Sequence, residues 1–403
     1  MVFKKLDIPS VLLFVLSALG VLFGVTTAAL TLISAYGFSE TGLAASDEMT
    51  ALSTSVLLIS VGMLNVPTLI TSIKKLLKKP IRQSKKSYLQ KANYYLFLWL
   101  LIITVGFFIS REGNKTFLLA PLTAAAVFIP VWWLIEFSRR GLPRSTKLRE
   151  WGTLTIGLTI TPIVIISIEL LLTAIAAVVV MIRLEFQPNL ISQLRSILEN
   201  ISQNKGGIGE LEQIQFEMMK QPIVSAAVFL ILGLIAPLIE EIFKPMSTWF
   251  LLSRPLEEFE GFSLGLISGG AFAILESAGI VIQMGSQDWL IAVALRAATG
   301  VLHIGLSGLV GYGLARSWHQ KQFGRGLIYI ITATILHGIW NSMALLSGFS
   351  SSVFNRPEME TSGTSGVISL IFLMVIFISI IAITLKINSR LRQDLARPIE
   401  PSL

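Results

Sequence analysis

Cysteine is absent from the 403-residue chain, and this absence excludes several kinds of chemistry. No disulfide framework can form, and no thiolate can act as a nucleophile or as a metal ligand. Charged residues are also scarce, because they make up 14% of the chain, whereas soluble proteins carry about 25%. With 53% hydrophobic residues, the chain has more apolar surface than a soluble core would bury, so we expect it to lie in a lipid bilayer.

Long apolar runs dominate the sequence, and each has the length of roughly 20 residues that a helix needs to cross a bilayer. The first run is too long for the hydrophobic region of a signal peptide, so we expect it to be retained as a helix. The predicted fold is therefore all-α, a polytopic transmembrane helical bundle of about ten spans. The ten predicted spans are 9–36, 50–72, 92–110, 117–137, 152–182, 222–252, 262–284, 289–315, 326–347 and 365–386.

Basic residues cluster in the short segments between the apolar runs, mainly at 74–91 and 139–149. Cytoplasmic loops of membrane proteins carry an excess of Lys and Arg. This asymmetry predicts that both termini lie in the cytoplasm. The net charge of +8 then reflects orientation in the membrane, and we expect no nucleic-acid partner.

Polar residues divide the chain into three predicted parts. Residues 1–221 hold the first five spans and an external loop, 183–221, whose apolar spacing fits either a short amphipathic surface helix or an ordinary packed loop helix. Residues 222–347 hold four spans with nearly all the intramembrane polar groups, so they form the predicted functional core. Residues 348–403 are expected to contain a Ser/Gly-rich loop at 348–364, the last span and a basic cytoplasmic tail.

Ionisable side chains are concentrated near the middle of the spans in this predicted core. Each such group costs about 2.5–3.5 kcal/mol to insert at mid-bilayer, so it is a functional candidate by default. Four helices bring carboxylates and imidazoles to a similar depth, which independent placement would not produce. The ionisable residues are Glu240, Glu241, Lys244, Glu276, Arg296, His303 and His337.

Prolines and glycines indicate irregular backbone and close packing in the same region. Pro237 and Pro245 flank the glutamate pair, and each removes one hydrogen bond and frees a carbonyl one turn earlier. Irregular backbone at this depth is tolerated where it lines a cavity or is buried in protein. Gly265 and Gly269 match the small-xxx-small pattern, for which we expect plain helix packing.

The intramembrane residues could support hydrolysis. Two neighbouring carboxylates in a low dielectric cannot both ionise freely, which suits Glu240 or Glu241 to act as a general base. A second group, His337 with Asn341 four residues later, could stabilise an oxyanion. Two histidines and a glutamate could also hold a zinc ion with an open position, although no His-Glu-x-x-His motif is present. A buried structural pair between Lys244 and either glutamate is the alternative.

Four short motifs in order resemble those of the PrsW family of intramembrane proteases, over residues 237–341. The third is His303 followed by a glycine-rich stretch, and each of the four lies on a predicted span. The other three are Glu240-Glu241-Ile242-Phe243-Lys244, Phe272-Ala273-Ile274-Leu275-Glu276 and His337-Gly338-Ile339-Trp340-Asn341.

The resemblance implies a multi-pass bacterial protein of the cell membrane that cuts a membrane-anchored regulatory protein, in the best-known case an anti-sigma factor. The family is often labelled a metalloprotease, which implies Zn²⁺ as a cofactor. It also looks related to the CAAX-prenyl endopeptidase (Abi) superfamily. Glu276 stands where that superfamily often has histidine, which leaves the partner that activates water open.

By this resemblance each motif residue has an expected role. Glu240 is the general base, with Glu241 beside it, and Glu276 and His303 assist it. His337 and Asn341 hold the oxyanion. The same resemblance implies a metal set of Glu276, His303 and His337, with Lys244 and Phe272 as structural support.

Two other functions fit intramembrane carboxylates and histidines. A proton- or cation-coupled transporter uses such groups as relays, and transporters often have repeated halves with broken helices. We find no such repeat in the sequence. A non-catalytic membrane scaffold would tolerate replacement of both glutamates by glutamine.

Overall fold

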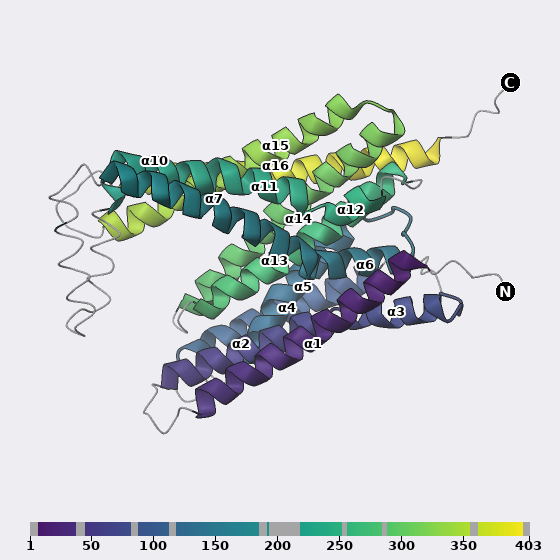
Figure 1. Ribbon diagram of the computed structural model, residues 1–403, viewed down its shortest axis with the longest axis horizontal. Coiled ribbons are helices and arrows are strands. Elements are labelled where there is room, and N and C mark those ends of the chain that lie inside the picture. The colour runs from purple at the N-terminus through teal and green to yellow at the C-terminus, as the bar shows by residue number, and fades with distance from the viewer. Residues whose placement is uncertain are drawn as a thin grey trace. The chain divides into compact units, whose positions relative to one another are not determined.

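The computed structural model describes residues 7–37, 45–81, 88–112, 118–184, 192, 218–251, 256–283, 288–354 and 362–397 (Figure 1). Every extended regular element within these ranges is a helix. In chain order they are α1 (Ile8–Gly37), α2 (Ala45–Met63), α3 (Val66–Leu76), α4 (Leu89–Ser110), α5 (Leu119–Ser138), α6 (Lys147–Leu158), α7 (Ile160–Leu184), α10 (Pro222–Leu230), the π-helical η3 (Ile231–Ile235), α11 (Ala236–Phe243), α12 (Met246–Leu251), α13 (Glu258–Gln283), α14 (Trp289–His319), α15 (Phe323–Phe354) and α16 (Ser362–Ala396).

Ten helical segments of the described chain are long and apolar enough to cross a membrane, which confirms the predicted all-α, ten-span fold. Three of them are built from consecutive helices that are interrupted within the span, namely Ala51–Leu76, Lys147–Arg183 and Pro222–Phe250. The other seven are Ile8–Ser34, Leu89–Ser110, Leu119–Ser138, Glu258–Ile280, Trp289–His319, Phe323–Ser347 and Gly366–Ala396. Their orientation in the membrane stays a prediction.

Two predicted loops have different outcomes. A Ser/Gly-rich loop is predicted at 348–364, but α15 continues to Phe354 and α16 begins at Ser362, and residues 355–361 lie outside the described residues. Neither end contains a proline that would stop its helix. The apolar positions of the predicted surface helix in 183–221 lie outside the described residues.

The chain divides into two compact units. The first comprises Met1–Pro162, Glu241–Ala333 and Phe377–Leu403, and the second comprises Ile163–Glu240 and Thr334–Ile376. The boundary between them passes through α11, at the peptide bond that joins Glu240 to Glu241. Each unit is considered by itself below.

Helices α13 and α14 form the most extensive helix pair of the first unit. Glycines on α13, spaced four residues apart, allow this close approach, because a Cβ at Gly265 would overlap the backbone carbonyl of Ser307. A Cβ at Gly269 would likewise overlap the carbonyl of His303. The small-xxx-small prediction of helix packing is confirmed, and the packing holds the α14 backbone at His303 against α13.

The start of α13 is also fixed by charge. Glu260, on its first turn, is buried and pairs with Arg149 of α6 at 2.9 Å. Ser145 donates a second hydrogen bond to Glu260 over 2.6 Å. These contacts anchor α13 at the end opposite to Glu276.

Candidate functional site

The sixth span departs from regular helical geometry where its prolines predict. A π-helical turn, η3, precedes Pro237, which has no N–H to donate, and the helix breaks again between α11 and α12 at Pro245. Side chains satisfy carbonyls near the second break. Trp249 Nε1 donates to the Ile242 carbonyl over 2.9 Å, and Ser268 Oγ donates to the Lys244 carbonyl.

Five charged or ionisable side chains of the first unit form one continuous row of contacts. Lys244 Nζ lies 3.0 Å from Glu241 Oε1 and 2.8 Å from His303 Nδ1. On the other edge of the imidazole, His303 Nε2 lies 2.5 Å from Glu276 Oε2. Arg296 Nη2 is the last group in this row, at 2.8 Å from the same carboxylate oxygen. Positive and negative groups therefore alternate around a central histidine.

The partners of His303 define its tautomer. A lysine ammonium has three donors and no acceptor, so Nδ1 of His303 must accept from Lys244. Nε2 then carries the proton and donates it to the Glu276 carboxylate. His303 is 1% exposed and Lys244 is fully buried, so this arrangement compensates charges that would be costly to leave alone in an apolar interior.

Phe272 packs against the same two residues. Its ring meets the His303 ring edge to face, with 5.3 Å between centroids. Lys244 Nζ lies over the Phe272 ring, 4.5 Å from its centroid, which is a cation–π distance. These contacts fit the supporting role that the sequence predicts for Phe272.

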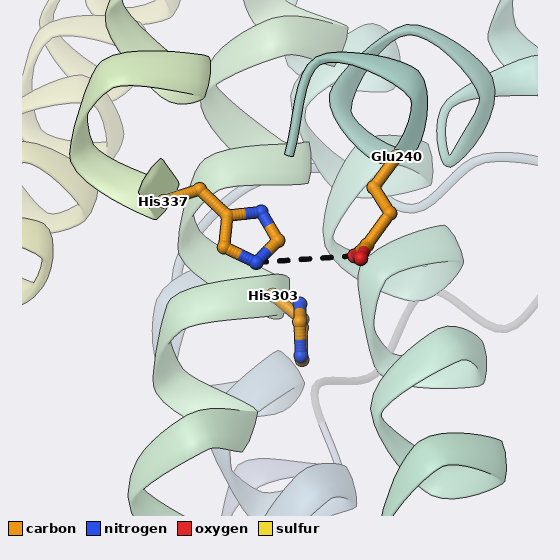
Figure 2. A group of neighbouring side chains, drawn as sticks. All are labelled: Glu240, His303 and His337. Atoms are coloured by element: carbon orange, nitrogen blue, oxygen red, sulfur yellow. Dashed lines mark ion pairs between the residues drawn. The ribbon is translucent and has the colours of Figure 1, made fainter. Parts of the chain in front are cut away.

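The second unit holds the other pair of predicted site residues. Glu240 Oε2 lies 3.9 Å from His337 Nε2, and Figure 2 marks this ion pair with a dashed line. His337 is 1% exposed. One turn further along α15, Asn341 Nδ2 donates to the Leu232 carbonyl of the π-helical turn over 3.1 Å. The irregular backbone of the sixth span is therefore bound by the helix that carries His337.

Gly233 and Gly338 make this approach possible. A Cβ on Gly338 would overlap the Gly233 carbonyl, and a Cβ on Gly233 would overlap the Ser342 hydroxyl. Glycine is required at 338 because the backbone of Gly233 lies against it, whereas a side chain at 233 would require only that Ser342 shifts. The close approach keeps His337 at the level of Glu240.

The two neighbouring glutamates differ in burial and in their partners. Lys244 follows Glu240 by four residues and Glu241 by three, and its Nζ forms an ion pair with Glu241 at 3.0 Å. Glu241 is fully buried in this pair, whereas the Glu240 side chain is 12% exposed. Consecutive residues of a helix point about 100° apart, so the two carboxylates belong to different groups of side chains.

Sequence reasoning missed two participants. Arg296 is among the ionisable residues of the predicted core, but the sequence does not predict that it pairs with Glu276, as it does at 2.8 Å. Ser277 is the second, because it accepts a hydrogen bond from Arg296 Nε over 3.2 Å. The seven-residue spacing of Arg296 and His303 was the available signal, since both had to face the same neighbouring helix.

Three described residues each offer one ligand atom to a metal ion: Glu240, His303 and His337, which Figure 2 draws. Within the second unit, zinc bonds of about 2.0–2.2 Å would let one ion bridge ligand atoms up to roughly 4 Å apart. The 3.9 Å between Glu240 and His337 fits this span. His303 fits only if Nδ1 exchanges Lys244 for the ion. Glu276, predicted as a ligand, pairs with Arg296 and His303 instead, as a carboxylate that orients an imidazole does.

Comparison with known proteins identifies one family. A model described as "PrsW family intramembrane metalloprotease" matches residues 161–382, which is more than half of the chain. No curated protein and no solved structure matches the chain.

Proposed function

Because the chain belongs to the PrsW family of intramembrane metalloproteases, we propose that it hydrolyses a peptide bond of a membrane-anchored regulatory protein with water that Glu240 activates. The ten apolar segments make it a multi-pass membrane protein. A bacterial cell membrane is the location that the family resemblance favours.

The proposal is supported most directly by a covalent link, the peptide bond between Glu240 and Glu241. Glu240 and His337 form a pair in one unit, and Glu241 begins the row of contacts through Lys244, His303 and Glu276 in the other. Consecutive Cα atoms are only 3.8 Å apart. The peptide bond between Glu240 and Glu241 therefore tethers the two groups of side chains to one point of the sixth span, whatever the arrangement of the units.

In the proposed mechanism Glu240 removes a proton from the attacking water. Its side chain is 12% exposed, whereas the side chain of Glu241 is fully buried and paired with Lys244. General base catalysis by a positioned carboxylate contributes about 10²–10⁴ in rate. Glu276 orients His303 through Nε2, so His303 assists from a fixed position.

His337 and Asn341 are the proposed oxyanion donors. An asparagine amide carries two N–H groups, and one of them donates to the Leu232 carbonyl. That hydrogen bond fixes the direction in which the second N–H group of Asn341 points. Removing one oxyanion donor typically costs about 10²–10³ in rate.

A metal ion, when bound, would lower the pKa of its water to about 7 and polarise the scissile carbonyl. Glu240 and His337 of the second unit would hold it, and His303 offers a further imidazole nitrogen as a candidate ligand. His337 would then be a ligand rather than an oxyanion donor, and Asn341 would keep the donor role.

A comparison of membrane proteomes tests the proposal and finds the substrate. Strains with the wild-type protein, Glu240→Gln or Glu257→Gln are compared. Glu257 is an exposed glutamate next to α13, so Glu257→Gln controls for loss of a charge. We expect one full-length membrane protein to accumulate in the Glu240→Gln strain alone. Identical proteomes in all three strains, with ion-driven uptake by the purified protein, would favour a transporter.

A further inference from the structure

A large apolar cavity lies in the first unit, and none of the proposed catalytic residues is among the residues that line it. Its volume is about 740 Å³, and its walls come mainly from α4, α5, α6 and α13. Ile102, Phe128, Ile129 and Leu154 are among the apolar residues that line it. A volume of this size is typical of sites for small amphiphilic ligands.

One end of the cavity is charged. Arg139 and Arg144 both pair with Glu150, at 3.1 and 2.7 Å, and Arg144 also pairs with Glu136 at 3.3 Å. Lys147 lines the same end and forms no ion pair within the described residues. Two arginines and one lysine against two glutamates leave a net charge of +1, so this end of the cavity attracts an anion.

The arginines at this end also include a hydrogen-bond donor that the described residues leave unsatisfied. Arg139 is 9% exposed, and its Nε has no hydrogen-bond partner among the described residues. Burial alone would lower the pKa of Arg144, but its hydrogen bond and charge interaction with Glu150 dominate and raise it. Arg144 therefore stays protonated at any physiological pH.

The position of the charged end matches the membrane interface. It lies between the end of one span, Leu119–Ser138, and the start of the next at Lys147. Tyr88 and Trp132 line the cavity, and such aromatic residues favour the level of the lipid headgroups. The apolar remainder of the cavity extends from this level along the spans.

We propose that the cavity binds one anionic phospholipid, with an acyl chain between α4, α5 and α13 and the phosphate at Lys147 and Arg144. Basic pockets between transmembrane helices recognise anionic headgroups in this way, and phosphate takes charge-assisted hydrogen bonds from guanidinium groups. The proposal is independent of the proposed peptidase function.

A transmembrane segment of a protein substrate fits the cavity less well. A helix that crosses the bilayer is about 30 Å long and at least 10 Å wide, which corresponds to roughly 2,400 Å³. The cavity holds about a third of that volume. An acyl chain is narrower and needs no hydrogen-bond partners along its length.

Native mass spectrometry of the purified full-length protein tests this proposal. The protein is mixed with phosphatidylglycerol or phosphatidylcholine of identical acyl chains. We expect one phosphatidylglycerol to be retained in preference to phosphatidylcholine. Lys147→Gln should reduce its retention about fivefold, the effect of one basic residue near an anionic headgroup. Lys79→Gln removes an exposed lysine outside the cavity and should change nothing.

A second pair of variants tests the apolar part. Ala125→Phe fills the cavity from its wall and should reduce the retention of both lipids, whereas Ala29→Phe, on an exposed face of α1, should not. Melting temperatures show whether each variant is folded. The proposal would be overturned if the wild-type protein retained phosphatidylglycerol and phosphatidylcholine equally and Lys147→Gln did the same. Co-purification of a peptide that phosphatidylglycerol does not displace would also overturn it.

Discussion

At the scale of single residues, the site is governed by compensation of buried charge. Lys244 and Glu241 are both fully buried, and they form an ion pair at 3.0 Å. Removing one partner of a buried ion pair leaves the other uncompensated and typically costs about 3–5 kcal/mol. We therefore expect substitutions of Glu241 or Lys244 to lower the stability of the protein, and substitution of Glu240, the proposed general base, to lower the rate of cleavage.

Lys244→Met should lower the free energy of unfolding by about 3–5 kcal/mol, because it leaves Glu241 buried without its counter-charge. Adding Glu241→Gln to the same chain should recover part of this loss. Unfolding of the purified protein in denaturant measures both effects. Lys386→Met, at an exposed lysine of α16, serves as the control. If Lys244→Met were as stable as Lys386→Met, the pair of Lys244 and Glu241 would not contribute to stability.

Metal content should depend on the proposed ligands. The purified wild-type protein loaded with Zn²⁺ should hold about one ion per chain, and His337→Ala should lose it, because the proposed site then keeps too few protein ligands. Elemental analysis after gel filtration measures this. His319→Ala, a histidine at the end of α14 that we place outside the site, should bind as the wild type does. Equal zinc in all three proteins would remove His337 from the metal site.

At the scale of elements, the structure shows what the sequence could not specify. The prolines predict that the sixth span is broken, and η3 and the gap before α12 confirm it. The sequence could not decide which glutamate Lys244 would meet, because spacings of three and four residues both bring side chains together on a helix. The sequence therefore leaves both glutamates open as partners, and in the structure Lys244 pairs with Glu241.

Gly269→Ala should displace α14, because the new Cβ would overlap the carbonyl of His303. We expect a loss of about 1–3 kcal/mol in stability, as for other overpacked sites, together with reduced cleavage. Gly279→Ala, on the same helix, is the matched control, because its Cβ would meet nothing within 4 Å. Alanine there should be neutral or stabilising by up to about 1 kcal/mol. Equal effects of the two substitutions would contradict the close packing of α13 on α14.

At the scale of the whole molecule, composition predicts a membrane protein, because only lipid can accommodate so much apolar surface, and the long apolar runs predict its ten spans. Some span ends differ from the prediction, for example by five residues at Lys147 and by ten at Ala396, because the helices continue there through polar residues. The partners of Glu276 were harder to predict. They depend on how α13 and α14 face each other, and hydropathy carries no information on that.

The predicted orientation can be tested without background, because the chain has no cysteine. Lys79→Cys should react with a membrane-impermeant maleimide only in inverted vesicles, since the basic loop is predicted to be cytoplasmic. Asp288→Cys, at the start of α14, should react only in intact cells. Labelling of both positions from the same side would refute the predicted topology.

Cleavage by the purified protein in proteoliposomes tests most directly whether Glu240 activates the attacking water. The substrate is the membrane protein that accumulates in the Glu240→Gln strain, and appearance of a new terminus measures cleavage. We predict that wild type and Glu257→Gln cleave at the same rate, and that Glu240→Gln, although folded, loses at least about 10² in rate. Cleavage by folded Glu240→Gln at the wild-type rate would contradict the role of Glu240.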